Sequence, residues 1–269
     1  MKAREALLSI EEIVKNFGDQ RAIGSYYLDF SRRLEVLKLA EEYCRHGSTV
    51  FDLGAQPFIV SCAFKKIGFN VTAFDIDPEP YREIADACGV SVVRCDLERD
   101  ELSVDNADCV VFTEVLEHLH YYYVPLVLSK INKALKLGGV LILTTPNIAS
   151  LFRRLRLLLG IQPQYSFHVH EYTMKEVIAL LRETGFEIIK AYYSIVNDLT
   201  LIDADPEEHL RILSFKDLVR IALKKPTKLN ILRLLAYPIV KLKSDTRQLM
   251  VFIAKKIKGQ TLQSLDRWN

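Results

Sequence analysis

The sequence predicts an α/β protein built on a largely parallel β-sheet with helices on both faces. Two observations lead to this fold class. From residue 49 onward, short apolar runs rich in Val, Ile, Phe and Thr alternate with stretches that have the length and apolar spacing of helices. Such alternation requires crossover connections, which place successive strands parallel to one another in one sheet. A chain of 269 residues, 49% of them hydrophobic, is long enough to bury the core of such a fold.

The first 46 residues differ from the rest because their apolar positions follow helical spacing. One series covers residues 7–14, and the pattern returns over residues 34–40. Gly18 and Gly24 predict breaks between these helices. We therefore expect an N-terminal helical cap over residues 1–46.

Five apolar runs that follow the cap are expected to be strands: 49–53, 69–75, 90–95, 108–113 and 139–145. The stretches between them are expected to be helices, most clearly at 58–67, 79–87 and 122–136. Because the runs are almost continuously hydrophobic, the strands should be buried on both faces.

The alternation of predicted strands and helices is interrupted after Pro146. Residues 149–159 predict a basic amphipathic helix, and residues 161–170 predict a loop. A further helix begins after Thr173, which is expected to act as its N-cap and to form a capping box with Glu176; Gly185 is expected to end it.

Two late strands are expected at 187–196 and 247–256. The segment between them, about 205–244, predicts two or three helices broken at Pro226 and Pro238. An insertion of this length is typical of a lid or a substrate platform. Residues 259–269 are expected to form a tail.

Composition excludes several classes of protein. No apolar run approaches the roughly 18 residues of a membrane-spanning helix. Glu5, Glu11 and Glu12 stand where a secretory signal would be apolar, so a cytoplasmic protein is expected. The five cysteines form no C-x-x-C pair and are expected to be buried thiols rather than disulfides.

Acidic residues follow four of the predicted strands, where ligands bind in an open parallel sheet. Asp52 and Gly54 end the first strand, Asp75 the second, Asp96 the third and Glu114 the fourth. Each carboxylate alone could cap a helix. Their recurrence at consecutive strand ends predicts a binding site, and an acid after the second strand is placed to accept two hydrogen bonds from a ribose diol.

These strand ends carry motifs that resemble the class I S-adenosylmethionine-dependent methyltransferases. The motifs are VFDLGAQPF, FDID, CDL, FTEVLEHL, GGVLILTTPN and HVHEYT. The resemblance covers residues 47–195 and the terminal strand, and it is strongest to the branch of ubiquinone-biosynthesis O-methyltransferases and glycan-cluster methyltransferases. It implies a Rossmann-like, seven-stranded sheet with an antiparallel last strand, a methyltransferase domain over 47–258, and S-adenosylmethionine as cofactor.

The resemblance also implies roles for individual residues. Asp52 and Gly54 would contact the methionine moiety of the cofactor, Asp75 the ribose and Asp96 the adenine. The full set expected to bind the cofactor is Asp52, Gly54, Gln56, Asp75, Ile76, Asp96, Leu97, Thr113 and Glu114.

One departure from the family pattern concerns the glycine-rich motif. Gln56 and Phe58 stand where the family usually has glycine. The Gln56 side chain would crowd the cofactor carboxylate unless its amide donates to that group. Because only the first glycine of G-x-G-x-x-G is present, a dinucleotide-binding dehydrogenase is excluded.

The segment E-x-x-E-H predicts the catalytic chemistry. Helical spacing would bring Glu114, Glu117 and His118 to one face, and His168 would return from the loop after the fifth strand. In similar metal-dependent methyltransferases, including RNA 2′-O-methyltransferases, such residues bind an ion. Two catalytic roles stay open: a divalent metal site (Mg, Mn or Zn) formed by all four residues, or a general-base role for His118 with Glu117 beside it. A purely structural role is the third reading.

The acceptor is expected to be a small molecule: a glycan, a lipid-linked sugar or a quinone-like compound methylated on oxygen. Residues 211–258 carry 13 Lys and Arg against Asp217 and Asp245, whereas the whole chain has a net charge of +2. With the helix at 149–159, this basic region could contact a membrane peripherally.

The alternative to a catalytic methyltransferase is a non-catalytic subunit that docks on a membrane or a partner through the basic region. A metal-dependent RNA 2′-O-methyltransferase is a second one, although basic residues without interleaved aromatics make nucleic acid a weak candidate. The oligomeric state cannot be inferred.

Overall fold

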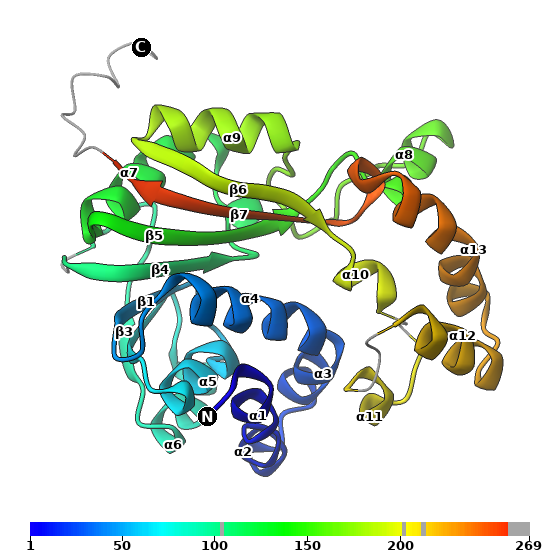
Figure 1. The fold of residues 1–269 in the computed structure, drawn as a ribbon, viewed down its shortest axis with the longest axis horizontal. Helices are drawn as coiled ribbons and strands as arrows, with labels where there is room; N and C mark the ends of the chain where they lie inside the picture. The colour runs from blue at the N-terminus through cyan, green and yellow to red at the C-terminus, as the bar shows by residue number, and fades with distance from the viewer. Residues whose placement is uncertain (103–104, 201–202, 211–213, 258–269) are drawn as a thin grey trace.

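The computed structural model describes residues 1–102, 105–200, 203–210 and 214–257, and it contains a seven-stranded sheet with helices on both faces (Figure 1). The strand order is β3-β2-β1-β4-β5-β7-β6. Strands β1 to β5 are parallel, and β7 is antiparallel to both β5 and β6. The predicted fold class and the antiparallel last strand are thereby confirmed.

The strands begin and end within a few residues of the predicted runs. Their bounds are β1 Thr49–Leu53, β2 Asn70–Asp75, β3 Ser91–Arg94, β4 Ala107–Thr113, β5 Leu135–Pro146, β6 Phe186–Ser194 and β7 Leu249–Lys256. Alternate residues of a strand point to opposite faces, so Val50 joins the core under the N-terminal helices while Phe51 joins the core on the other face.

The N-terminal cap consists of four helices: α1 Ala3–Leu8, α2 Glu11–Phe17, α3 Gln20–Leu28 and α4 Phe30–Tyr43. Gly18 ends α2 in the left-handed conformation, with φ 81°. The predicted break at Gly24 is wrong, because Gly24 lies inside α3. That helix begins instead at Asp19, whose side chain accepts a hydrogen bond from the Ala22 N–H and so supplies a stronger start signal.

The remaining α-helices are α5 Ile59–Ile67, α6 Arg82–Ala87, α7 Val124–Ala134, α8 Leu151–Leu158, α9 Met174–Glu183, α10 Val196–Leu199, α11 Pro206–His209, α12 Phe215–Lys224 and α13 Lys228–Leu242. Short 3₁₀ turns lie at η1 Glu79–Tyr81, η2 Leu116–His118, η3 Tyr121–Tyr123 and η4 Ser244–Thr246. Thr173 and Glu176 form the predicted capping box of α9.

The basic insertion contains α10 to α13 between β6 and β7. Pro226 separates α12 from α13 as predicted, but the predicted break at Pro238 is wrong because Pro238 lies inside α13. Pro238 is exposed, so the carbonyl that loses its intrahelical donor can be solvated. The predicted tail at 259–269 lies outside the described residues.

The insertion and the N-terminal cap enclose the same end of the sheet. Figure 1 shows α8, α10, α12 and α13 beyond the ends of β5 and β7, and α10 packs on α4 while α11 packs on α3. No described helix is both long enough and apolar enough to cross a membrane.

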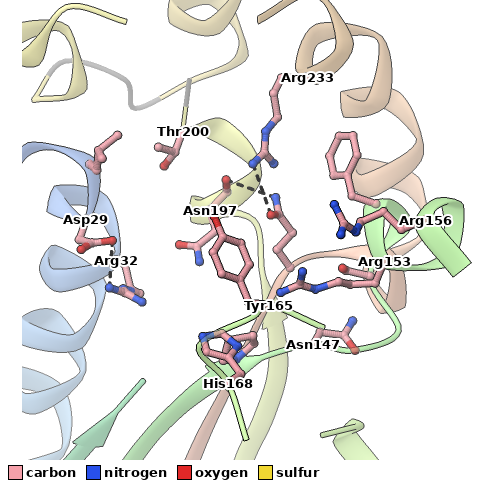
Figure 2. Close-up of a pocket in the computed structure, with 15 residues that line it drawn as sticks. Asp29, Arg32, Asn147, Arg153, Arg156, Tyr165, His168, Asn197, Thr200 and Arg233 are labelled. Atoms are coloured by element: carbon pink, nitrogen blue, oxygen red, sulfur yellow. Dashed lines mark hydrogen bonds and ion pairs between the residues drawn. The ribbon is translucent and has the colours of Figure 1, made fainter. Parts of the chain in front are cut away.

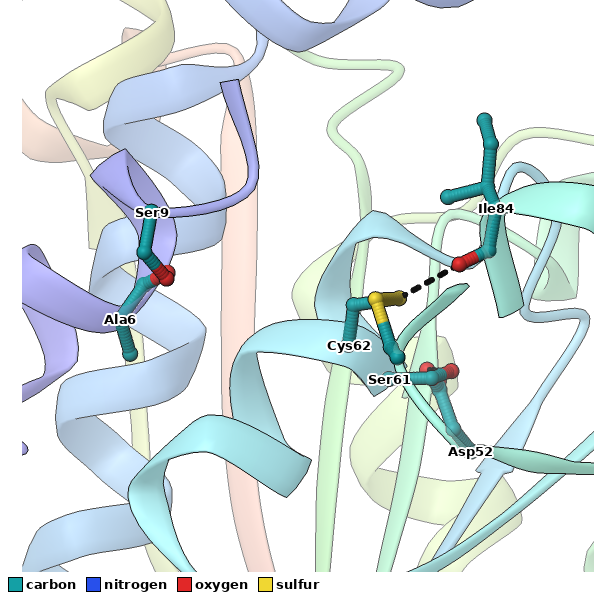
Figure 3. Close-up of a disulfide and its surroundings, with 7 residues drawn as sticks. Ala6, Ser9, Asp52, Ser61, Cys62 and Ile84 are labelled. Atoms are coloured by element: carbon teal, nitrogen blue, oxygen red, sulfur yellow. Dashed lines mark hydrogen bonds between the residues drawn. A yellow bond between two sulfur atoms is a disulfide. The ribbon is translucent and has the colours of Figure 1, made fainter. Parts of the chain in front are cut away.

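The expectation that all cysteines are thiols is wrong for one pair. Cys62 of α5 and Cys88 after α6 form a disulfide whose Cα atoms are 5.4 Å apart (Figure 3). The two residues are 26 positions apart, and only the packing of α5 against α6 brings them together. Cys95 and Cys109 are buried free thiols, as expected, and Cys44 is a half-buried one.

Candidate functional site

Two cavities lie at the carboxyl ends of the strands, and Asp29 and Arg32 at the start of α4 line both. The smaller, about 150 Å³, lies against the ends of β1 and β4. The larger, about 400 Å³, lies between α4, α8, α10 and α13. Five residues predicted to bind the cofactor line the smaller cavity: Asp52, Gly54, Gln56, Thr113 and Glu114.

Asp52 is a buried carboxylate held by one hydroxyl. Ser61 Oγ donates to Asp52 Oδ2 at 2.5 Å, and Ser61 is the residue before the disulfide-bonded Cys62 (Figure 3). Burial and the nearby charge of Asp75 raise the pKa of Asp52 to about 6, against the lowering effect of Ser61 and Arg33. A group with this pKa is charged at neutral pH and can pair with a bound ammonium.

Gly54 turns the chain from β1 toward α5. Its φ is 67°, and a Cβ placed there would clash with the side chain of Val115. Glycine is therefore required at this turn both for its conformation and for the close approach of the loop after β4.

Gln56 holds the loop after β2. Its backbone N–H donates to Asp75 Oδ2 at 3.0 Å, and its side-chain Nε2 donates to the carbonyl of Asp77 at 2.7 Å. The Asp77 N–H donates to Asp75 Oδ1 at 3.2 Å. The amide of Gln56 is thus bound to a protein carbonyl, and the two loops that follow β1 and β2 orient the Asp75 carboxylate together.

Asp75, Ile76, Asp96 and Leu97 do not line either cavity. They lie on the neighbouring loops after β2 and β3, which pair in parallel. Ile76 is 58% exposed and free to contact a flat ring, whereas Leu97 is buried. Asp96 Oδ1 accepts a hydrogen bond from the Glu98 N–H at 3.0 Å. The predicted ribose and adenine residues therefore lie together on these two loops, and Asp75 is connected to the smaller cavity through the N–H of Gln56.

Glu114 does not join Glu117 and His118 on one helical face, so that prediction is wrong. Its φ is 56°, and the 3₁₀ turn begins only at Leu116. The left-handed conformation turns its carboxylate toward α4, where it pairs with Arg32 and accepts from Thr144 Oγ1 at 2.9 Å. Glu114 is thereby removed from the predicted metal ligands.

Glu117, His118 and His168 do come together. One potential ligand atom from each lies within 4.8 Å of the other two, and the two imidazole rings meet edge to face with centroids 4.9 Å apart. His118 Nδ1 lies 3.2 Å from the carbonyl oxygen of Phe167, and His168 Nδ1 lies 2.7 Å from Glu171 Oε1. Both rings keep Nε2 available, and partners of this kind orient the histidines of metal sites. The donor set fits a divalent ion with open positions.

The same cluster has perturbed acid–base properties. Burial, and then the charge of Glu114, raises the pKa of Glu117 well above its ordinary value. Thr145 Oγ1 donates to the Glu117 carboxyl at 3.0 Å. Burial and the neighbouring His168 lower the pKa of His118, so its imidazole is neutral at pH 7 and able to accept a proton.

Glu171 organises the wall of the larger cavity. Its Oε1 receives hydrogen bonds from His168 Nδ1, from Arg153 Nη2 at 2.6 Å and from the Tyr165 N–H at 3.0 Å. Although burial raises the pKa of Glu171, these hydrogen bonds and the charge of Arg153 lower it overall. His168 lines the cavity while His118 does not. In the sequence, Glu171 was noticeable only as a position of the HVHEYT motif that matches the family pattern, with no role of its own.

The larger cavity is lined with arginine side chains from the two basic segments of the sequence, residues 149–159 and 211–258. Figure 2 shows Arg153 and Arg156 of α8 and Arg233 of α13 opposite Asp29 and Arg32. The polar residues Asn147, Ser150, Tyr165, Asn197, Thr200 and Gln248 complete the lining together with apolar side chains. Arg233 comes from a helix some 80 residues beyond α8, so no local pattern could have grouped these side chains.

Comparison with known proteins agrees with this geometry. A family model described as a methyltransferase domain matches residues 26–191. No curated protein matches the chain. A solved S-adenosylmethionine-dependent methyltransferase from Archaeoglobus fulgidus is similar, with a TM-score of 0.58, 19% identity and coverage of 88% of this chain and 100% of that chain. A second, from Mesorhizobium loti, has a TM-score of 0.56, 17% identity and coverage of 85% and 100%.

A third similar structure is a phosphoethanolamine N-methyltransferase from Haemonchus contortus in complex with phosphomonomethylethanolamine and S-adenosylhomocysteine. It has a TM-score of 0.58 and 16% identity, and the match covers 88% of this chain and 57% of that chain. The family model spans more than half of the chain, and the residues predicted for the cofactor follow the ends of β1 to β4. The chain therefore belongs to the methyltransferase-domain family, and it is a class I methyltransferase whose methyl donor is S-adenosylmethionine.

Proposed function

We propose that this enzyme methylates a hydroxyl group of a small acceptor that carries a phosphate or a similar anionic group. The observation behind this proposal is the convergence of Arg153, Arg156 and Arg233 on the larger cavity, next to the smaller one. A cavity of about 400 Å³ suits one small molecule or headgroup. Guanidinium groups recognise phosphate through paired hydrogen bonds.

Two of these arginines have N–H groups that make no hydrogen bond with the described residues. Among the described residues, Arg156 hydrogen-bonds only through Nε, to the carbonyl of Gln162 at 2.9 Å. Arg233 Nη2 donates to Gln248 Oε1 at 3.3 Å, and its buried Nη1 makes no hydrogen bond within the described residues. The closest carboxylate oxygen to that Nη1 belongs to Asp198, at 3.9 Å. Arg153, by contrast, is already bound to Glu171.

This arrangement favours a phosphorylated or lipid-linked sugar over a neutral quinone-like acceptor. A quinone would leave the Arg156 charge without a counterion in the complex and the buried Nη1 of Arg233 without a hydrogen bond, at a desolvation cost. The third similar structure holds a phosphate-bearing acceptor, which is consistent with the proposal but belongs to a distant relative. An RNA acceptor is disfavoured because the cavity has room for one group rather than a strand.

Asp29 and Arg32 separate the site of the methyl donor from that of the acceptor. Arg32 pairs with Asp29 Oδ1 at 2.9 Å and with Glu114. Direct transfer requires the methyl group and the acceptor oxygen to meet in line, and two cavities that share a wall provide that proximity.

His168 is the proposed base for the acceptor hydroxyl. It lines the acceptor cavity, and Glu171 fixes the proton on Nδ1 so that Nε2 can accept another. His118 and Glu117, the residues predicted from sequence, lie next to it but do not line the acceptor cavity. A divalent ion held by Glu117, His118 and His168 is the alternative; it would lower the pKa of the acceptor hydroxyl. Loss of activity in EDTA, with recovery in Mg²⁺, Mn²⁺ or Zn²⁺, would favour the ion over the free base.

Methyl transfer from tritiated S-adenosylmethionine into extracts of the source cells tests the acceptor class. We expect labelling that disappears when the extract is first treated with a phosphatase and the phosphatase is removed. Arg156→Gln and Arg233→Gln should each reduce labelling at least tenfold, because each removes a hydrogen bond to a charged group. Arg154→Gln is the matched control, since Arg154 lies on α8, pairs with Asp245 and does not line the cavity.

Two outcomes would overturn the proposal. Equal labelling of treated and untreated extracts would show that the acceptor needs no phosphate. Full labelling by the Arg156 and Arg233 variants would show that these arginines do not bind the acceptor. Calorimetric titration with S-adenosylhomocysteine, run on every variant, separates loss of acceptor binding from loss of cofactor binding.

A further inference from the structure

The outer face of α13 is apolar although it is exposed. Ile231, Leu232, Leu235, Ile239 and Leu242 recur at helical spacing and form one stripe along the helix. Their exposed fractions run from 43% at Ile231 to 88% at Leu242. Single exposed leucines are ordinary on a protein surface, but a continuous stripe over three turns marks an interaction site.

A second exposed apolar face lies on α8 and the turn that follows it. Leu155, Leu157, Leu158 and Leu159 are 43%, 64%, 81% and 75% exposed. The two helices are neighbours, because the guanidinium of Arg233 from α13 lies 4.9 Å from the ring centroid of Phe152 on α8. Together these outer faces of α8 and α13 form the apolar docking face.

Both helices also contribute side chains to the acceptor cavity. Arg233 on α13, and Phe152, Arg153 and Arg156 on α8, line that cavity. On α13, helical spacing places Arg233 on the side opposite the apolar stripe. The same two helices therefore line the cavity and expose leucine to solvent.

The charge of the docking face is one-sided. The segments Leu151–Leu158 and Lys228–Leu242 contain no Asp or Glu. Their arginines are engaged elsewhere, because Arg153, Arg156 and Arg233 line the acceptor cavity and Arg154 pairs with Asp245. The cations that border the stripe are Lys228, Lys241 and Lys243, for which the described residues provide no ion pair. An apolar stripe bordered by such lysines is complementary to the headgroups and acyl chains of an anionic lipid surface.

We propose that the apolar docking face binds the surface of an anionic lipid bilayer, with α8 and α13 lying in the interface. The proposal goes beyond the methyl-transfer function, and it places the acceptor cavity beside the membrane from which a lipid-linked acceptor would come. A second copy of the chain is the competing occupant. The absence of carboxylates from both helices disfavours it, because two such faces would bring like charges together.

Sedimentation of the full chain with large unilamellar vesicles tests the proposal. The vesicles contain phosphatidylcholine alone or with 30% phosphatidylglycerol, a composition of roughly the charge of a cytoplasmic leaflet. We expect binding to the anionic vesicles that weakens in high salt. Leu235→Glu and Leu242→Glu should each weaken it at least about tenfold, because each replaces an inserted side chain with a charge.

Leu137→Glu is the matched control. Leu137 is 76% exposed but lies near the start of β5, away from the docking face, so this variant should sediment like the unchanged chain. Thermal melts of all three variants establish that they fold.

Failure of the folded chain to sediment with either vesicle would overturn the proposal. So would a dimer in solution that Leu235→Glu converts to monomer while vesicle binding is absent. Because the assay contains no methyl donor, its failure is distinct from failure of the methyl-transfer proposal, which is read by labelling from tritiated S-adenosylmethionine.

Discussion

The carboxylate of Asp75 is oriented by hydrogen bonds from two loops, those after β1 and β2. Both carboxylate oxygens of this buried residue already accept backbone hydrogen bonds, from Gln56 and Asp77. A carboxylate held in this way is ready to accept two hydroxyls without further ordering of its side chain.

Asp75→Ala should weaken cofactor binding by about 1.5–3 kcal/mol, the usual worth of hydrogen bonds to a charged group. Calorimetric titration with S-adenosylhomocysteine measures this change. Asp77→Ala is the control, because Asp77 contacts Gln56 and Asp75 through its backbone. Unchanged affinity in Asp75→Ala would disprove the assignment of the ribose to this residue.

Asp52 makes cofactor binding depend on pH. Its pKa of about 6 is raised by burial, so the carboxylate is charged above pH 6 and increasingly protonated below it. The methionine ammonium of the cofactor pairs only with the charged form. Affinity for S-adenosylhomocysteine should therefore be constant from pH 7 to 8 and fall as pH drops through 6.

Asp52→Asn provides the comparison for this pH dependence. The amide cannot titrate, so its weaker binding should lose most of the slope between pH 5 and 7. A slope identical to that of the unchanged chain would assign the pH dependence to another group.

Among the elements, α5 and α6 are joined by a covalent bond that the sequence did not reveal. The Cys62–Cys88 disulfide closes a loop that contains β2 and Asp75, the residue predicted to bind the ribose. Its stabilising effect is expected to be largest on this part of the sheet, next to the Ser61–Asp52 hydrogen bond.

Reduction of this disulfide should lower the free energy of unfolding by about 3.5 kcal/mol, the loop-entropy value for a loop of this length. Thermal melts with and without dithiothreitol measure the change. The Cys62→Ala, Cys88→Ala double variant should be insensitive to the reductant. A loss of stability on reduction that persists in the double variant would contradict this account.

Different secondary-structure elements line the two cavities of the site. The strand ends and the loops after β1 and β2 present the residues for the methyl donor, whereas α8 and the insertion line the acceptor cavity. The N-terminal helix α4 contributes Asp29 and Arg32 to both cavities. A change in the insertion should therefore alter acceptor binding without altering binding of the methyl donor.

At the scale of the whole molecule, cofactor binding should stabilise the native state. S-adenosylhomocysteine at 100 times its dissociation constant should add about 2.7 kcal/mol to the free energy of unfolding. For a chain of 269 residues this corresponds to a rise of roughly 5 °C or more in the melting temperature.

The same melt in EDTA tests for a resident metal. A melting temperature that falls on chelation, with or without the cofactor, would indicate an ion at Glu117, His118 and His168. A melting temperature unchanged by EDTA would favour His168 as an unassisted base. No shift with millimolar S-adenosylhomocysteine would contradict the binding of this cofactor.

Prediction from the sequence succeeded where the signal was local. Strand ends, the capping box at Thr173 and the turn at Gly54 follow from a few neighbouring residues, because burial on both faces, helix capping and left-handed turns impose short patterns. It failed where two local signals competed. Gly24 and Pro238 are helix breakers by propensity, yet Gly24 lies in a helix that starts at the Asp19 cap, and Pro238 lies on the exposed side of α13.

The sequence by itself determined the fold class and the family, since these depend on periodicity and on motifs at fixed spacing, and it placed acidic residues at four strand ends as candidates for binding the cofactor. Only the tertiary structure decided the partners of those residues. It turned Glu114 toward Arg32, joined Cys62 to Cys88, and brought Arg233 to α8 to form the acceptor cavity. Such contacts join residues far apart in the chain, and their geometry arises only when the helices pack around the sheet.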